Sequence, residues 1–393
     1  MTKYKVAIAT WYNYKNYGTA LQAGAMTNCI SKLGGDAFML AYEPKGTLIN
    51  TTPLAFASFI KRCTKRLFGR RTSLYLSAER DELFDFYLKE RVNETAECRT
   101  FPELRSMSEG FDAILCGSDQ IWNTDITRGI NKGFFLDFKT NGKKISYAAS
   151  MGIPRLEEKY EKDFVNAVEN IDCVSVREDT LKEYINSLTD KEVEKVVDPT
   201  LLLEKEDYND LLKENMIDGK YLLIYALGPD ERLTKIAEQK AAEKNLKIVE
   251  LNDFKLKEYF CEQVSNAGPE EFLTLIKNAE VVVTNSFHGT VFSLLYNKPF
   301  YTIKVNEYID ARAENLLTEL GLESRLVDIG EECNWDMNFN DIQSRMDIYV
   351  KKSLPYFILG PFFMVVEACG EFILPFLNKD IIDNGAAKAD VDY

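Results

Sequence analysis

The residues best suited to chemistry surround His288, the only histidine in the chain. A run of valines, Val281 to Val283, predicts a buried strand, and Asn285 to Gly289 then turn the chain. Residues 290–296 predict a helix after this turn. In such a unit the turn lies at the carboxyl edge of the sheet, where free N–H groups at the helix start attract an anion. An imidazole in the turn is therefore placed to exchange protons with a bound ligand near neutral pH.

A structural role for His288 is the alternative. A single histidine is often a side chain whose hydrogen bonds are satisfied within the protein. Gly289 lets a ligand approach the backbone, which favours the binding interpretation without deciding it. Both interpretations stay open on this stretch alone.

Polar residues also follow four other predicted strands at their carboxyl ends, where ligands bind in open α/β sheets. They are Asn16 and Gly18 after strand 5–11, Ser118, Asp119, Gln120 and Trp122 after strand 112–117, Arg177 after strand 173–176, and Asp198 after strand 196–197. An arginine there can bind a phosphate or carboxylate through two parallel hydrogen bonds, and a tryptophan can stack on a sugar ring. Turn formation, helix capping and an Arg177–Glu178 ion pair are the structural alternatives.

Two runs of alternating strands and helices must position these residues. The first run has strands at 5–11, 37–42, 112–117, 144–151, 173–176 and 196–197, with helices at 19–33 and 78–93; the second has strands at 221–227 and 247–251, helices at 233–245 and 269–278, and the unit 281–303. This alternation predicts an α/β fold with two doubly wound Rossmann-like domains facing a cleft. The predicted domains are residues 1–208 and 209–352, with closing helices at 310–321 and 342–354.

Composition narrows the possible partners. A chain of 393 residues is too long for one ordinary core, and its net charge of −14 argues against a nucleic-acid partner. The eight cysteines form no CxxC pair, so we interpret them as reduced thiols of a cytoplasmic protein with no zinc site. The two standard phosphate loops, GxGxxG and GxxxxGK[ST], are absent. We expect no metal, although carboxylates alone can hold magnesium.

Two segments are candidates for membrane association. Residues 54–71 form a basic amphipathic helix pattern, which suits an anionic membrane surface or a pyrophosphate-bearing acceptor, or else a solvated helix face. Residues 356–377 are apolar and long enough to span a bilayer, although Glu367 and Glu371 argue against a lipid-facing span. The tail 353–393 resembles the first membrane helix of an ABC exporter subunit. The tail could be a fusion remnant or a genuine anchor at the inner face of the membrane, and the sequence leaves both interpretations open.

Six blocks in order resemble the polysaccharide pyruvyl transferase family over about residues 1–350. They are NYGTALQ (16–22), GSDQIWN (117–123), SYAASMG (146–152), SVRE (175–178), VDPT (197–200) and TNSFHGTVFSL (284–294). The resemblance implies a GT-B-like fold and transfer of a pyruvyl group from phosphoenolpyruvate to two sugar hydroxyls as a ketal, in bacterial exopolysaccharide or cell-surface glycan synthesis. Phosphoenolpyruvate is then a substrate, no cofactor is expected, and the acceptor is a sugar that is either lipid-linked or nucleotide-linked.

The resemblance also implies roles for the candidate residues. His288 and Arg177 match the catalytic positions. The donor would bind to Ser286, Gly289 and Thr290 on the 209–352 side, together with Arg177 from the 1–208 side. Acceptor-binding or cleft positions would be Asn16, Gly18, Ser118, Asp119, Gln120, Trp122 and Asp198. Several family members carry an arginine close before the histidine, where this chain has Ser286 and Phe287. A glycosyltransferase using a nucleotide sugar and a non-catalytic glycan-binding protein therefore remain alternatives.

Overall fold

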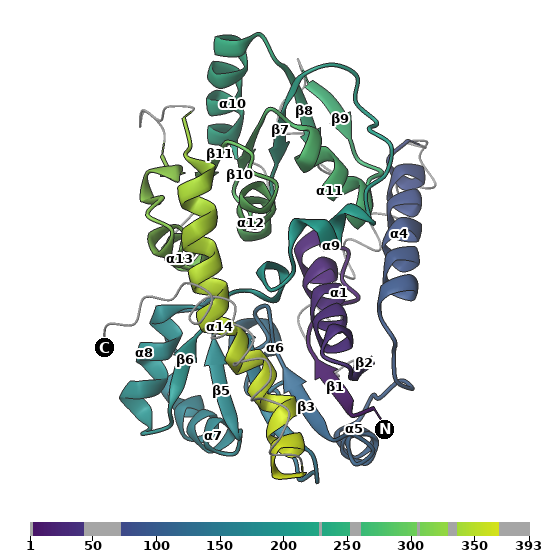
Figure 1. Ribbon diagram of the computed structural model, residues 1–393, viewed down its shortest axis with the longest axis vertical. Coiled ribbons are helices and arrows are strands. Elements are labelled where there is room, and N and C mark those ends of the chain that lie inside the picture. The colour runs from purple at the N-terminus through teal and green to yellow at the C-terminus, as the bar shows by residue number, and fades with distance from the viewer. Residues whose placement is uncertain are drawn as a thin grey trace, which may run out of the picture.

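A computed structural model describes residues 3–42, 72–227, 230–251, 261–304, 307–328 and 336–368. Over these residues the chain forms two six-stranded parallel sheets with helices around them, one in each half of the molecule (Figure 1). The predicted class, α/β with two doubly wound Rossmann-like domains, is confirmed. The basic segment 54–71 lies outside the described residues, so its predicted role is not tested.

The first sheet contains the strands of the N-terminal half in the order β2-β1-β3-β4-β5-β6. These strands are β1 (Lys5–Ala9), β2 (Asp36–Met39), β3 (Ala113–Cys116), β4 (Lys143–Ala149), β5 (Cys173–Val176) and β6 (Val193–Lys195). The helices are α1 (Tyr17–Lys32), α4 (Thr72–Arg91), α5 (Phe101–Ser108), α6 (Thr124–Thr127), α7 (Glu158–Glu169), α8 (Asp179–Leu188), η1 (Pro199–Leu201) and α9 (Lys205–Asn209). The order reverses between β1 and β3, which therefore flank the switch point of this sheet.

The second sheet has the order β12-β11-β10-β7-β8-β9. Its strands are β7 (Tyr221–Tyr225), β8 (Lys247–Leu251), β9 (Cys261–Val264), β10 (Val281–Thr284), β11 (Phe300–Ile303) and β12 (Leu326–Val327). The helices are α10 (Glu231–Lys244), α11 (Pro269–Asn278), α12 (Phe287–Leu295), α13 (Glu307–Glu319) and η2 (Glu323–Arg325). Here the order reverses between β7 and β10, so the turn that follows Val281–Val283 lies at the switch point of its sheet.

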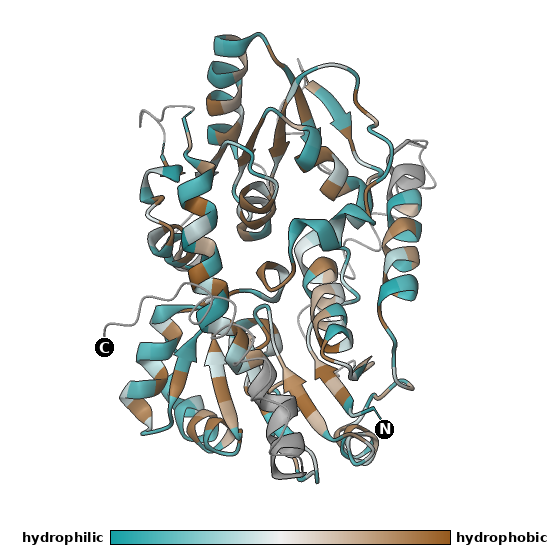
Figure 2. Cartoon of the chain, viewed as in Figure 1, coloured by the Kyte–Doolittle hydropathy of each residue, from teal (hydrophilic) through white to brown (hydrophobic). Residues whose placement is uncertain are grey.

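Burial on both faces explains why the strands are apolar runs. Val281, Val282 and Val283 are completely buried, as are Val6 and Ile8 of the first sheet. In Figure 2 the central strands are mainly hydrophobic, whereas the edge strands β6 and β9 are mainly hydrophilic. Parallel strands that are covered by helices on both faces have continuous hydrophobic sequences, and this pattern predicted the strands.

The last described helix, α14 (Phe339–Ala368), returns from the second half of the chain to the first sheet. It packs against β3, β4 and β5 and crosses that half in Figure 1. The helix predicted at 342–354 is therefore longer than expected, and it enters the segment 356–377 that we considered for a membrane span. Phe357 of that segment is completely buried, with its ring 4.9 Å from the ring of Tyr147. None of the described helices combines the length and apolar composition needed to cross a membrane.

The two halves touch through an aromatic contact as well as through α14. Tyr17 of α1 stacks on Phe272 of α11 with ring centroids 4.7 Å apart, and its hydroxyl donates a hydrogen bond to the carbonyl of Ala267 at 2.9 Å. Tyr225, at the end of β7, packs edge-on against the same tyrosine. This contact holds α1 of the first half next to the carboxyl edge of the second sheet.

Candidate active site

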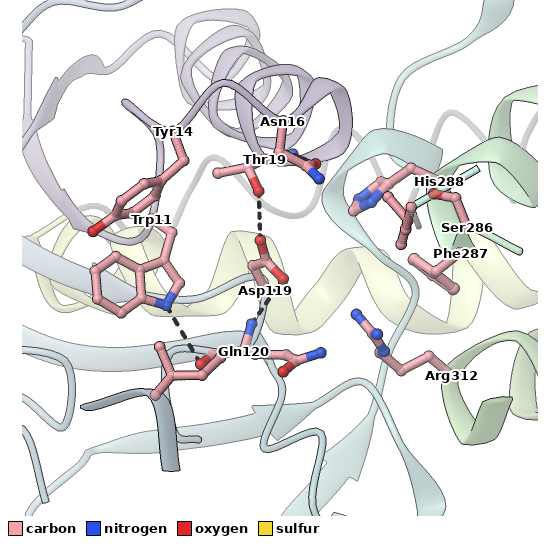
Figure 3. A pocket seen from close by; sticks show the side chains of 12 residues that line it. Trp11, Tyr14, Asn16, Thr19, Asp119, Gln120, Ser286, Phe287, His288 and Arg312 are labelled. Carbon is pink, nitrogen blue, oxygen red and sulfur yellow. Dashed lines mark hydrogen bonds between the residues drawn. The ribbon is translucent and has the colours of Figure 1, made fainter. Parts of the chain in front are cut away.

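A pocket of about 310 Å³ lies where the two switch points face each other. Its walls come from the loops after β1, β3, β7 and β10 and from α13, and Figure 3 shows them from close by. The lining residues are Trp11, Tyr14, Asn16, Thr19, Asp119, Gln120, Ile126, Leu227, Ser286, Phe287, His288 and Arg312. The structure thus brings the predicted Asn16, Asp119, Gln120, Ser286 and His288 together in one pocket.

His288 lies in the first turn of α12, whereas the sequence predicted it in the turn before the helix. Ser286 is the N-cap residue, because its hydroxyl accepts a hydrogen bond from the Gly289 N–H at 3.3 Å. A serine cap starts a helix at the next residue, so α12 begins three residues earlier than the predicted Thr290. The cap also fixes the direction of the histidine side chain, which points into the pocket (Figure 3).

The expected donor-binding set changes at two positions. Thr290 does not line the pocket: it is completely buried, and its hydroxyl lies 2.6 Å from that of Thr302 in β11. Gly289 packs against Thr284, since a Cβ there would lie 2.4 Å from the threonine Oγ1. Of the predicted site residues near the start of α12, Ser286 and His288 line the pocket.

The imidazole of His288 is enclosed by residues of the first half. A Cβ on Gly18 would lie 2.0 Å from the imidazole Nδ1, so only glycine fits that position of α1 without moving the ring. On the other side, Nε2 lies 3.7 Å from Oδ2 of Asp198 and has no hydrogen-bond partner among the described residues. His288 is 6% exposed, so the ring touches solvent mainly through the pocket.

Asp198 joins the two predicted catalytic residues. Its Oδ2 accepts a hydrogen bond from Nη1 of Arg177 at 2.5 Å and from Oγ of Ser118 at 3.0 Å, and its Oδ1 accepts from the Thr200 hydroxyl at 2.7 Å. Burial alone would raise the pKa of Asp198, but His288 and Arg177 together hold it well below its usual range. The carboxylate therefore stays ionised beneath the imidazole.

Arg177 lies behind the pocket wall. Its side chain is 2% exposed, and its guanidinium carbon sits 4.6 Å from the centre of the Phe287 ring. Burial would lower its pKa, but the surrounding carboxylates, Asp198 first, raise it. Arg177 and His288 thus converge on one carboxylate, and the guanidinium is turned toward Asp198. Ser118 and Asp198 likewise support the pocket from behind.

Asp119 is the carboxylate that faces the pocket. Its Oδ2 accepts a hydrogen bond from the Thr19 hydroxyl at 2.8 Å, and its Oδ1 lies 4.0 Å from Nη2 of Arg177. Burial would raise the pKa of Asp119, whereas Arg177 and His288 lower it, and the net shift is downward. Asn16 borders the same space and caps α1, because the Thr19 N–H donates to its Oδ1 at 3.1 Å.

The structure corrects the expected position of Trp122. This side chain is completely buried, stacked on Phe135 with ring centroids 5.0 Å apart, and its Nε1 donates to the carbonyl of Phe134 at 3.1 Å. Its indole therefore belongs to the core of the first half and is not available to a sugar. Trp11 borders the pocket instead, with Tyr14 beside it at 5.1 Å between ring centroids.

Sequence reasoning missed several lining residues. Trp11, Tyr14 and Thr19 carried a signal, because they lie in or beside the polar and aromatic loop after the first predicted strand. Arg312 carried none, since it sits inside a segment that reads as an ordinary amphipathic helix. Only the fold of the second half brings α13 to the pocket.

The fold and the pocket define a two-domain α/β protein with a polar site between its domains. A sequence model of the polysaccharide pyruvyl transferase family matches residues 16–307. This match covers most of the chain, which therefore belongs to the polysaccharide pyruvyl transferase family, a family of transferases. The predicted family membership is confirmed.

Other comparisons give weaker likenesses. UDP-N-acetylglucosamine 2-epimerase from Rickettsia bellii is 11% identical, with a TM-score of 0.48 over 93% of this chain and 99% of that one. The enzyme from Neisseria meningitidis bound to UDP-GlcNAc is 11% identical, with a TM-score of 0.48 over 92% of this chain and 98% of that one. UGT89C1 from Arabidopsis thaliana, complexed with quercetin, is 12% identical, with a TM-score of 0.40 over 91% and 92%. Curated proteins give no match to this chain.

Proposed function

We propose that this protein transfers the pyruvyl group of phosphoenolpyruvate to two hydroxyls of a sugar, forming a cyclic ketal and releasing phosphate. The observation that supports this most is the position of His288, at the edge of a pocket formed by both switch points and above the ionised Asp198. In the same proposal the reaction belongs to bacterial exopolysaccharide or surface-glycan synthesis in the cytoplasm. The acceptor is a sugar, and a lipid-linked one would bring the protein to the inner face of the membrane.

One side chain that both accepts and donates a proton can serve the whole reaction. Two sugar hydroxyls each form a bond to C2 of the donor, and the bond from C2 to the phosphate oxygen breaks. Of the two hydroxyl protons, one ends on C3, which becomes a methyl group, and the other leaves with the phosphate. A group that takes a proton from a hydroxyl and delivers one to C3 therefore returns to its starting state, and an imidazole does this near neutral pH.

The surrounding residues assist that exchange in the proposal. Asp198 stabilises the protonated imidazole, and Arg177 in turn keeps Asp198 ionised. Asp119 faces the pocket as an ionised carboxylate, so it is suited to accept a hydrogen bond from a sugar hydroxyl. Trp11 and Tyr14 offer aromatic faces to the sugar ring.

The test is a transfer assay with purified protein. Phosphoenolpyruvate is incubated with a panel of nucleotide-linked and lipid-linked sugars, while phosphate release and the mass of the sugar product are followed. We expect phosphate release only with a suitable acceptor, and a fall of about 10²–10⁴-fold in rate for His288→Gln with an unchanged thermal midpoint. The exposed Asp163→Asn serves as the control.

Three results would contradict the proposal. Unchanged turnover in His288→Gln removes the histidine from the mechanism. Turnover of a nucleotide sugar, with no consumption of phosphoenolpyruvate, favours the glycosyltransferase alternative. Glycan binding without turnover of either donor favours a non-catalytic role.

A further inference from the structure

We infer that Arg312 binds the anionic end of the donor, a phosphate or carboxylate group, in the pocket. The inference rests on the proposed function for the identity of the donor, and it assigns the binding of the anion to α13. Figure 3 shows the guanidinium of Arg312 reaching toward the pocket from the same side as His288. Three observations carry the inference: the burial of the side chain, its hydrogen bonds and the pairing of the nearby carboxylates.

Arg312 is buried without a full set of partners. It is 8% exposed, and its Nε has no hydrogen-bond partner among the described residues. The side-chain oxygen of Gln120, in the amide orientation that faces the guanidinium, accepts from Nη2 at 2.9 Å and from Nη1 at 3.2 Å. A neutral amide is thus the group that hydrogen-bonds this buried charge, while the carboxylates of Asp119, Glu178 and Asp198 act on it from a distance.

None of the carboxylates of the described residues contacts Arg312 directly. Asp198 pairs with Arg177, and Asp119 accepts from the Thr19 hydroxyl and from the backbone N–H of Gln120. Glu178 accepts a hydrogen bond from Ser150 through Oε1, while its buried Oε2 has no hydrogen-bond partner among the described residues. Among the described residues, Arg312 makes no ion pair within 4.0 Å. Burial, followed by repulsion from Arg177, lowers its pKa, although Asp119, Glu178 and Asp198 act in the opposite direction. Of the residues that line the pocket, Arg312 is therefore the cation best placed to bind an anion.

The geometry favours a small anion with a fork-shaped pair of oxygens. A planar guanidinium binds phosphate and carboxylate through parallel N–H donors, and its binding contributes most where water is excluded. Arg312 belongs to the second half of the chain, whereas Asp119 and Thr19 belong to the first. An anion on Arg312 is therefore held on the α13 side of the pocket, next to His288 and across from the carboxylate that suits a hydroxyl group.

Binding of inorganic phosphate and of phosphoenolpyruvate to the full chain tests the inference. Thermal-shift and calorimetric titrations compare the wild type with Arg312→Gln, Arg312→Lys and the control Arg345→Gln, whose guanidinium is exposed and already paired with Asp341. We expect both anions to bind the wild type and the control. Arg312→Gln should bind each of them at least tenfold more weakly, and Arg312→Lys should retain part of the affinity.

Two further readouts separate binding from a structural role. Without ligand, Arg312→Gln should melt no lower than the wild type, because it removes a buried charge that makes no ion pair among the described residues. In the transfer assay it should raise the KM for phosphoenolpyruvate at least tenfold and change kcat less. A lower melting temperature of the unliganded variant, or phosphate binding equal to that of the wild type, would overturn the inference, as would absence of phosphate binding to the wild type.

The inference and the proposed function can fail separately. If phosphate binding depends on Arg312 but phosphoenolpyruvate is never consumed, the anion site stands and the proposed reaction is wrong. If phosphoenolpyruvate is consumed with an unchanged KM in Arg312→Gln, the reaction stands and the anion site is wrong.

Discussion

At the scale of single residues, Asp198 should make stability depend on acid. In the unfolded chain an aspartate titrates near pH 3.9, whereas the folded pKa of Asp198 lies well below this. As the pH falls below about 5, the unfolded state takes up a proton that the folded state does not, so the free energy of unfolding falls. The contribution of Asp198 is fully present above the unfolded pKa and is lost as the pH falls toward the folded one.

Asp198→Asn should reduce this dependence. An amide cannot ionise, so the free energy of unfolding should change less between pH 5 and pH 3.5 than in the wild type. At pH 7 the variant should be less stable by about 3–5 kcal/mol, because Arg177 is left buried without its carboxylate. Urea denaturation at several pH values measures both effects, with the exposed Asp163→Asn as the control. An acid dependence equal to that of the wild type would rule out Asp198 as its source.

Gly18 is the residue at which a single methyl group should affect activity. An added Cβ would lie 2.0 Å from the imidazole Nδ1, so Gly18→Ala must displace the ring of His288. A displacement of about 1 Å at a reacting group costs about 100-fold in rate, and we expect a loss of that size in kcat. Gly110→Ala is the matched control, since the nearest atom to its Cβ is 3.9 Å away. Equal activity of the two variants would show that the position of the ring does not matter.

At the scale of elements, α14 is part of the core of the first half. Phe357 is completely buried against Tyr147, and the Ser353 hydroxyl accepts a hydrogen bond from the Val197 N–H at 3.0 Å. Phe357→Ala should therefore lower the free energy of unfolding by about 3–5 kcal/mol, whereas Leu354→Ala, at a side chain that is 37% exposed, should change it little. Urea denaturation measures the difference. Similar values for the two variants would mean that this part of α14 is dispensable.

At the scale of the whole molecule, Lys195 links the two halves. Its ammonium group lies 2.5 Å from Asp179 in the first half and 2.6 Å from Glu319 of α13 in the second. Lys195→Met should loosen this contact, lower the free energy of unfolding by about 1 kcal/mol, and raise the KM of the donor several-fold, because α13 carries Arg312. Lys182→Met is the control, since Lys182 pairs with Glu194 within the first half. An equal effect of both changes on KM would contradict a role for the contact between the halves.

The local pattern of the sequence predicted the fold and much of the pocket. Continuous apolar runs such as Val281–Val283 are buried on both faces of a parallel sheet, so they predict its strands. Asp119, Gln120, Ser286 and His288 follow such strands directly, and parallel strands gather their carboxyl ends at one edge. The domain boundaries at 208 and 352, the acceptor and the membrane contact of segment 54–71 stay predictions.

The tertiary structure alone decided which side chains face the pocket. Trp122 and Trp11 both follow strands. Trp122 packs against Phe135 in the core of the first half, whereas Trp11 lines the pocket. Arg312 has no signature in its own helix, because its place beside the pocket comes from the position of α13 and from the residues of the first half that lie opposite it. Strand and helix patterns depend on near neighbours in sequence, whereas burial and charge compensation depend on residues that meet only when the chain folds.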